Sequence, residues 1–220
     1  MNNINASSLF HFTKKFDTLK LIIKNGLRYS YAYEKYPKEI ISAYLNPFYS
    51  KNICKANGVG IPMISFCDIP ITRAEQHIKK YGKYMIGFNK DNFTYALRNV
   101  INPVIYVHSP NLRDAISQFG KEYAKCFCEI LDKITTKELD NKNKRKNNPY
   151  EYKKDLDLLI KTRFFSNFLI GLVKPIKDKN NYYYNEREWR TFIPINKYSN
   201  IDWIFDISQK EFNEKVNDWN

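Results

Sequence analysis

Glu186-Arg187-Glu188-Trp189-Arg190 lies inside a run, Tyr182 to Pro194, that is rich in aromatic residues. This composition favours a β-strand. Side chains alternate along a strand, so Glu186, Glu188 and Arg190 are expected to share one face. Three charges on one face of an otherwise apolar strand are costly unless they pair or take part in chemistry. The segment therefore indicates either a partly buried Glu188–Arg190 ion pair or catalytic carboxylates.

The composition indicates one folded domain. The chain has 220 residues, of which 43% are hydrophobic and 16% aromatic, with 17 Tyr and 15 Phe. This length can bury a substantial core, so we expect a single domain over residues 1–220. Strands and helices are interspersed without a regular βαβ period, which predicts an α+β fold rather than a doubly wound sheet.

Hydrophobic periodicity and turn residues place the expected elements along the chain. A loop is expected at residues 57–60, where two glycines follow an asparagine. The expected strands cover residues 9–12, 61–67, 83–88, 103–107, 164–173, 182–195 and 203–207. The expected helices cover residues 16–25, 37–45, 72–80, 91–98, 111–136, 150–161 and 209–217.

The chain is strongly basic, with 36 Lys and Arg against 23 Asp and Glu and a net charge of +13. This balance fits an anionic partner such as nucleic acid, or else a solvated surface in an Asn- and Lys-rich protein. Residues 137–149 are expected to form an exposed basic loop because they offer little apolar surface to bury. Its nucleic-acid-binding candidates are Lys142, Lys144, Arg145 and Lys146, although a merely solvated loop remains open.

No metal site is expected. The cysteines, Cys54, Cys67, Cys126 and Cys128, show neither zinc spacing nor a disulfide framework. A metal-dependent nuclease would have to use Glu186, Glu188 and Asp68, without a His or Asp pair at ligand spacing. No apolar run is long enough to cross a membrane, and no signal peptide is evident, so we expect a reduced cytoplasmic setting.

Four ordered blocks resemble the AbiGi family of abortive-infection proteins. They are Leu9 to Thr13, Phe16 to Leu27, Ile61 to Pro70, and the Glu-Arg-Glu-Trp-Arg segment. The similarity runs from about Ser8 to Pro194. It implies phage defence, with this chain as the antitoxin partner of a toxin–antitoxin pair.

The first block also resembles, more distantly, DarT-like ADP-ribosyltransferases, in which a strand histidine precedes a helix that ends in Asn or Ser and Gly. This second resemblance implies an ADP-ribosyltransferase-like fold of mixed sheets flanked by helices, with NAD as substrate. It implies that the catalytic residues are Glu188, Glu186 and His11, and that His11, Thr13, Ser65 and Phe66 contact NAD. His11, Ser65 and Glu188 would then converge on one cleft.

Two further residues have open roles. Arg28 follows the helix that ends at Gly26 and could meet a pyrophosphate oxygen, or could be a surface arginine. Tyr81 could stack on a planar ring or simply pack.

Two functional hypotheses follow. The first is a phage-defence enzyme that transfers ADP-ribose from NAD to nucleic acid or to a protein, with Glu188 stabilising the positive charge that develops on the sugar. The second is a non-catalytic antitoxin or regulator that binds a cognate toxin or operator DNA.

Overall fold

A computed structural model describes residues 7–36, 58–98, 100–143, 154, 157–158, 160–161, 169–175, 177–178, 181–192 and 209–218. The fold mixes helices with largely antiparallel sheet, as the sequence predicts. The chain divides into two compact units, each described by itself. The first comprises Met1–Ala32, Ile61–His108 and Leu172–Ile193, and the second Tyr33–Gly60, Ser109–Gly171 and Pro194–Asn220.

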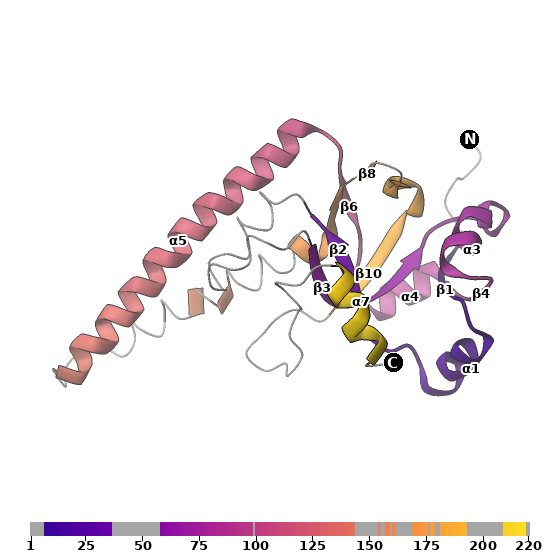
Figure 1. The fold of residues 1–220 in the computed structure, drawn as a ribbon, viewed down its shortest axis with the longest axis horizontal. Helices are drawn as coiled ribbons and strands as arrows, with labels where there is room; N and C mark the ends of the chain where they lie inside the picture. The colour runs from indigo at the N-terminus through magenta and orange to yellow at the C-terminus, as the bar shows by residue number, and fades with distance from the viewer. Residues whose placement is uncertain are drawn as a thin grey trace. The chain divides into compact units, whose positions relative to one another are not determined.

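The main sheet has the strand order β4-β1-β3-β10-β5, with β2 paired to β3 (Figure 1). Strand β1 is antiparallel to β3 and to β4, and β10 is antiparallel to β3 and to β5. The strands are β1 (Ser8–Thr13), β2 (Ser30–Lys35), β3 (Gly58–Cys67), β4 (Tyr84–Asn89), β5 (Ile101–Pro103) and β10 (Glu188–Phe192).

One face of this sheet carries an apolar core. Leu9, Ile64, Phe66 and Ile101 are buried together there, and Phe93 of α4 (Lys90–Ala96) packs against them. The Phe66 ring makes edge contacts with Phe93, with ring centroids 5.0 Å apart. This face therefore has the packing of a hydrophobic core.

The opposite face carries polar residues. Register aligns Cys67 with Glu188 and Ser65 with Arg190, and facing residues of paired strands project to the same side. Helix α3 (Glu75–Tyr81), after the 3-10 turn η3 (Ile71–Arg73), covers this side through its contact with Phe12.

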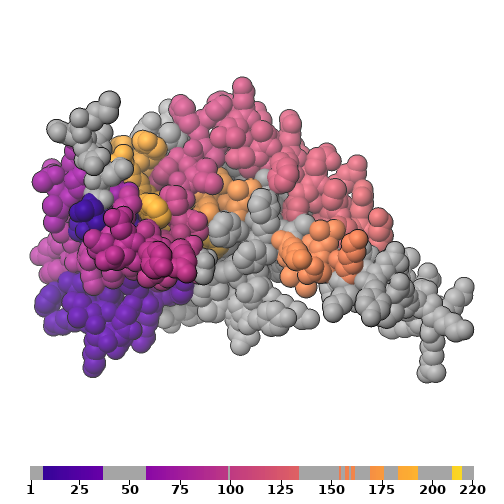
Figure 2. Space-filling view, turned by 180° about the vertical axis from the view of Figure 1, so that it is seen from behind, coloured from indigo at the N-terminus to yellow at the C-terminus, as the bar shows by residue number. Residues whose placement is uncertain are grey.

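Helix α1 (Phe16–Asn25) is confirmed at the predicted bounds. It ends at Gly26, whose φ of 81° is in the left-handed region and whose N–H donates to the Ile22 carbonyl at 2.9 Å. The helix contacts β1 and β4, and Figure 2 shows its indigo surface beside the magenta segment that carries α3, β4 and α4.

Shorter pieces complete the first unit. Strand β6 (Ile105–Val107) runs parallel to β7 (Val173–Pro175), and β8 (Lys177–Asp178) is antiparallel to β9 (Asn181–Tyr182). The 3-10 turn η4 (Tyr183–Glu186) leads into β10.

The second unit contains the long helix α5 (Pro110–Asn143) and the C-terminal helix α7 (Gln209–Asp218). Ser117 and Phe127 lie on the buried side of α5. The rings of Tyr33 and Phe212 lie 5.2 Å apart, and the Tyr36 hydroxyl donates to the Ile170 carbonyl at 2.7 Å. No helix in the described segments is long and apolar enough to cross a membrane.

Three sequence predictions are wrong in part. Residues 137–143 belong to α5 rather than to a loop, because this stretch contains good helix formers and no Gly or Pro. Residues 58–60 extend β3 instead of forming a loop. In the predicted strand 164–173, residues 169–172 are helical, since periodicity does not separate a short apolar strand from a helix.

The predicted strand 182–195 is shorter than expected. Residues 183–186 form η4, Arg187 has a φ of 44°, and the strand covers Glu188–Phe192. The predicted helix 37–45, the predicted strand 203–207 and the basic residues Lys144, Arg145 and Lys146 lie outside the described residues. Lys142 lies in the last turn of α5.

Candidate functional site

The carboxylate of Glu188 is held by three hydrogen bonds from cations. Arg190 donates from Nε to Oε1 at 2.8 Å and from Nη2 to Oε2 at 3.0 Å, and Lys174 Nζ donates to Oε2 at 3.0 Å. The Arg190 side chain is fully buried. The Glu188–Arg190 ion pair expected from the sequence is therefore present.

Glu186 is paired just as closely. Lys174 Nζ donates to its Oε2 at 2.9 Å, the Tyr81 hydroxyl donates to Oε1 at 2.8 Å, and Lys80 also pairs with Oε1. We name Lys80, Lys174, Glu186, Glu188 and Arg190 the ionic cluster; it lies within the first unit and holds three cations and two carboxylates.

Local backbone geometry brings the two glutamates to one lysine. Glu186 ends η4 and Glu188 begins β10, while Arg187 between them adopts a φ of 44°. Its N–H donates to the Tyr184 carbonyl at 3.2 Å, and its carbonyl accepts from the Asp68 N–H at 3.0 Å. The two carboxylates thus share Lys174 although they do not belong to one strand.

Electrostatics keeps both glutamates ionised. Burial opposes the charged form of Glu188, but Arg190 and then Lys174 outweigh it and lower its pKa. Burial likewise opposes ionisation of Glu186, and the attraction of Lys174 with hydrogen bonds from Lys80 and Lys174 lowers its pKa. Burial raises the pKa of the neighbouring Cys67 thiol, which keeps it protonated and unreactive.

The sheet separates His11 from Glu188. Phe10 faces Cys67 across β1 and β3, and Cys67 faces Glu188, so His11 projects to the opposite side of the sheet. Its ring lies 5.9 Å from that of Phe66, and its Nδ1 lies 2.9 Å from the Ser65 carbonyl oxygen. Burial lowers the pKa of His11. The predicted convergence of His11 and Glu188 on one cleft is therefore wrong, because β1 places the histidine on the apolar face.

The remaining predicted site residues are dispersed. Phe66 is a core residue, Thr13 pairs with Tyr84 at the end of β1, and Arg28 is exposed. Ser65 lies on the Glu188 side, where its hydroxyl helps to lower the pKa of Glu188.

Tyr81 joins the ionic cluster through its hydroxyl rather than through ring stacking on a ligand. Burial, followed by the charge of Glu186, raises its pKa. The hydroxyl therefore remains a hydrogen-bond donor to that carboxylate.

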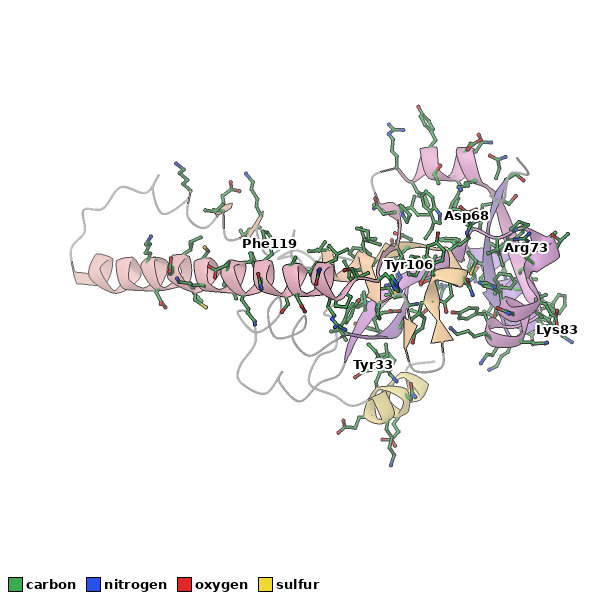
Figure 3. All side chains as sticks on the ribbon, turned by 90° about the horizontal axis from the view of Figure 1, so that it is seen from above. Tyr33, Asp68, Arg73, Lys83, Tyr106 and Phe119 are labelled. Carbon is green, nitrogen blue, oxygen red and sulfur yellow. The ribbon has the colours of Figure 1, made fainter. Side chains whose placement is uncertain are left out.

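Sequence reasoning missed Lys80, Lys174 and Tyr106. The Glu188 N–H donates to the Tyr106 hydroxyl oxygen at 2.9 Å; Tyr106 is labelled in Figure 3. Of these three residues, only Lys174 has a sequence pattern that could have indicated a buried charge, because it directly follows the apolar pair Leu172 and Val173.

The acidic residues considered for a metal each face a cation. Asp68, labelled in Figure 3, pairs with Lys90, whose Nζ lies 5.4 Å from the centre of the Trp189 ring. Among the described residues, no group of three or more His, Cys, Asp or Glu side chains is placed to hold a metal ion.

Fold and site together define an α+β protein with a largely buried ionic cluster on one face of an antiparallel sheet. A family model described as "Putative abortive phage resistance protein AbiGi, antitoxin" matches residues 32–218. The chain belongs to this AbiGi family. The first two of the four blocks, Leu9 to Thr13 and Phe16 to Leu27, lie outside this match. Searches among curated proteins and among solved structures give no match.

Proposed function

We propose that this protein is the non-catalytic antitoxin of an abortive-infection pair and acts by binding its cognate toxin. The family description carries the proposal, because it names an antitoxin and the match, over residues 32–218, includes parts of both compact units. The ionic cluster supports it independently, since its carboxylates are occupied by this chain's own cations.

Co-expression tests the proposal. The chain is expressed alone and together with the product of the neighbouring gene, and growth is followed. An antitoxin leaves growth unchanged when expressed alone and restores growth that the neighbouring product arrests. Growth arrest by the chain alone would contradict the proposal.

Transfer of ADP-ribose from NAD is the second candidate, favoured by the paired glutamates Glu186 and Glu188. The chemistry needs a carboxylate beside the ribose carbon that carries nicotinamide. Glu188 would first have to exchange its bonds with Arg190 and Lys174 for substrate, at the cost of taking a carboxylate away from two buried cations. This requirement makes the enzyme the weaker of the two proposals.

Labelled NAD, incubated with the folded chain and total cellular RNA, DNA and protein, tests the enzyme directly. The antitoxin proposal expects neither label transfer nor nicotinamide release. Transfer that is lost in Glu188→Gln, at a melting temperature matched to the parent protein, would support the enzyme instead.

The partner of the antitoxin is a toxin protein, and operator DNA is the further partner that the net charge of +13 favours. A gel-shift titration with the DNA upstream of the gene tests whether the protein binds its operator. Retardation that disappears with rising salt would support operator binding, because counterion release makes such affinity salt-dependent.

A further inference from the structure

A pocket of about 400 Å³ opens beside the ionic cluster, within the first unit. Three segments form it: the stretch after β3, helix α3, and the turn that leads into β10. Its volume lies in the range of small-molecule sites. The lining residues are Ile69, Pro70, Arg73, Gln76, His77, Tyr184, Asn185 and Arg187.

The lining of the pocket is basic. Arg73, labelled in Figure 3, and Arg187 line it, and none of its lining residues in the described chain is acidic. Glu186, which lies between the lining residues Asn185 and Arg187 in the sequence, belongs to the ionic cluster, in which three cations face two carboxylates. An anion in this pocket would therefore meet a lining that contains two arginines and no acidic residue.

His77 adds a buried polar group to the pocket wall. It is 6% exposed, and neither ring nitrogen has a hydrogen-bond partner at bonding geometry. Burial lowers the pKa of His77, and the charge and main chain of Glu186 oppose this in part. Rings of Phe12 and Tyr81 pack at 6.0 Å from it. Unsatisfied buried polar groups are costly, and a ligand oxygen would satisfy this one.

The backbone of the pocket is unusual at Arg187. Its φ of 44° is the only positive value at a non-glycine position among the described residues. Such conformations persist when their surroundings impose them and cluster at ligand sites. Here the bonds of Arg187 to Tyr184 and Asp68 impose it.

We propose that this pocket binds a phosphate-bearing small molecule of mononucleotide size. Guanidinium groups bind phosphate through paired N–H donors, which suits Arg73 and Arg187. Gln76 and Asn185 offer amide groups, and the half-exposed Tyr184 ring offers a flat apolar surface for a base. The site is independent of the toxin-binding proposal, because it uses neither the toxin nor the ionic cluster.

Calorimetric titration of the full chain with inorganic phosphate, adenosine and guanosine monophosphates, and glutarate tests this. We expect the monophosphates to bind more tightly than inorganic phosphate, and glutarate to bind least. Arg73→Gln and Arg187→Gln should each weaken binding about tenfold, as expected for loss of a charge-assisted contact. Lys79→Gln is the matched control, since Lys79 lies on α3, pairs with exposed Glu75 and does not line the pocket.

A second readout does not depend on the variants. The side-chain nitrogen resonances of His77 should shift when a monophosphate is added, because a ligand oxygen would meet its ring. Three results overturn the proposal: no binding up to roughly 10 mM ligand, affinity unchanged in both arginine variants at an unchanged melting temperature, or glutarate binding as tightly as phosphate.

Discussion

At the scale of single residues, the cost of burying Arg190 governs the site. A guanidinium with no exposed surface requires a carboxylate beside it, and Glu188 supplies both of its oxygens. Lys174 joins this pair to Glu186. Removing one member leaves an uncompensated buried charge, whereas removing a matched pair does not.

Glu188→Gln should therefore lower the free energy of unfolding by about 3–5 kcal/mol. Glu75→Gln removes an exposed carboxylate paired with Lys79 and should cost about 0–1 kcal/mol. Denaturant unfolding at neutral pH measures both. Equal losses in the two variants would contradict a buried cluster.

Acid should destabilise the fold through the same residues. Both glutamates have a lower pKa in the folded state, so their contribution is present above the unfolded value of about 4.3 and is lost as pH falls through the folded values. Glu188→Leu combined with Arg190→Met should reduce this loss. Unfolding curves of the parent protein and of this double variant are measured at neutral pH and at about pH 3. If both proteins lose the same free energy of unfolding between the two pH values, the ionic cluster does not cause the acid destabilisation.

At the scale of elements, tight turns set the positions of the strands around the cluster. Gly82 ends α3 before β4 with a φ of 115°, and a Cβ there would lie 2.3 Å from the Thr13 carbonyl oxygen. Gly26 ends α1 with a φ of 81° and has no atom within 4 Å of such a Cβ. A side chain at Gly82 would therefore meet both a steric clash and backbone strain, whereas one at Gly26 would meet backbone strain alone.

Gly82→Ala should destabilise the protein more than Gly26→Ala. The second change costs about 1–2 kcal/mol of left-handed strain, and the first adds a clash with backbone atoms. Thermal melting of both variants measures the difference. A smaller effect at Gly82 would mean that β1 and α3 are less closely packed than described.

The same elements show how far the sequence predicts this fold. Strand β1 and helices α1 and α7 follow from periodicity and from Gly26, because their signals are local. The Glu188–Arg190 pair follows from strand alternation. The partners Lys80 and Lys174 do not, since they meet the glutamates only through tertiary packing. The resemblance to ADP-ribosyltransferases assigns His11 to the site, whereas the register of β1 with β3 determines its side of the sheet.

At the scale of the whole molecule, the proposed toxin partner rests on family membership, and the proposed contact with operator DNA rests on net charge. The charge of +13 and the cluster of Lys142, Lys144, Arg145 and Lys146 are properties of the sequence. The family match covers residues 32–218 and therefore includes them.

Replacing these four basic residues by Ala tests whether they contact DNA. If they do, affinity for operator DNA should fall, and its salt dependence should become shallower by about 0.9 per lost phosphate contact. The melting temperature should barely change, because the substitutions replace hydrophilic residues and Ala at Lys142, in the last turn of α5, is a good helix former. If affinity and salt dependence are unchanged, these four residues do not contact DNA and are only solvated.

The central claim is that the ionic cluster holds the fold together and the protein acts by binding its toxin. Growth rescue by the variant Glu188→Leu with Arg190→Met tests it most directly, because this variant removes the carboxylate of the enzyme hypothesis while leaving no unpaired Arg190 charge. Its melting temperature is measured alongside. We expect the folded variant to neutralise the product of the neighbouring gene as fully as the parent protein does. A folded variant that has lost the rescue would contradict the claim.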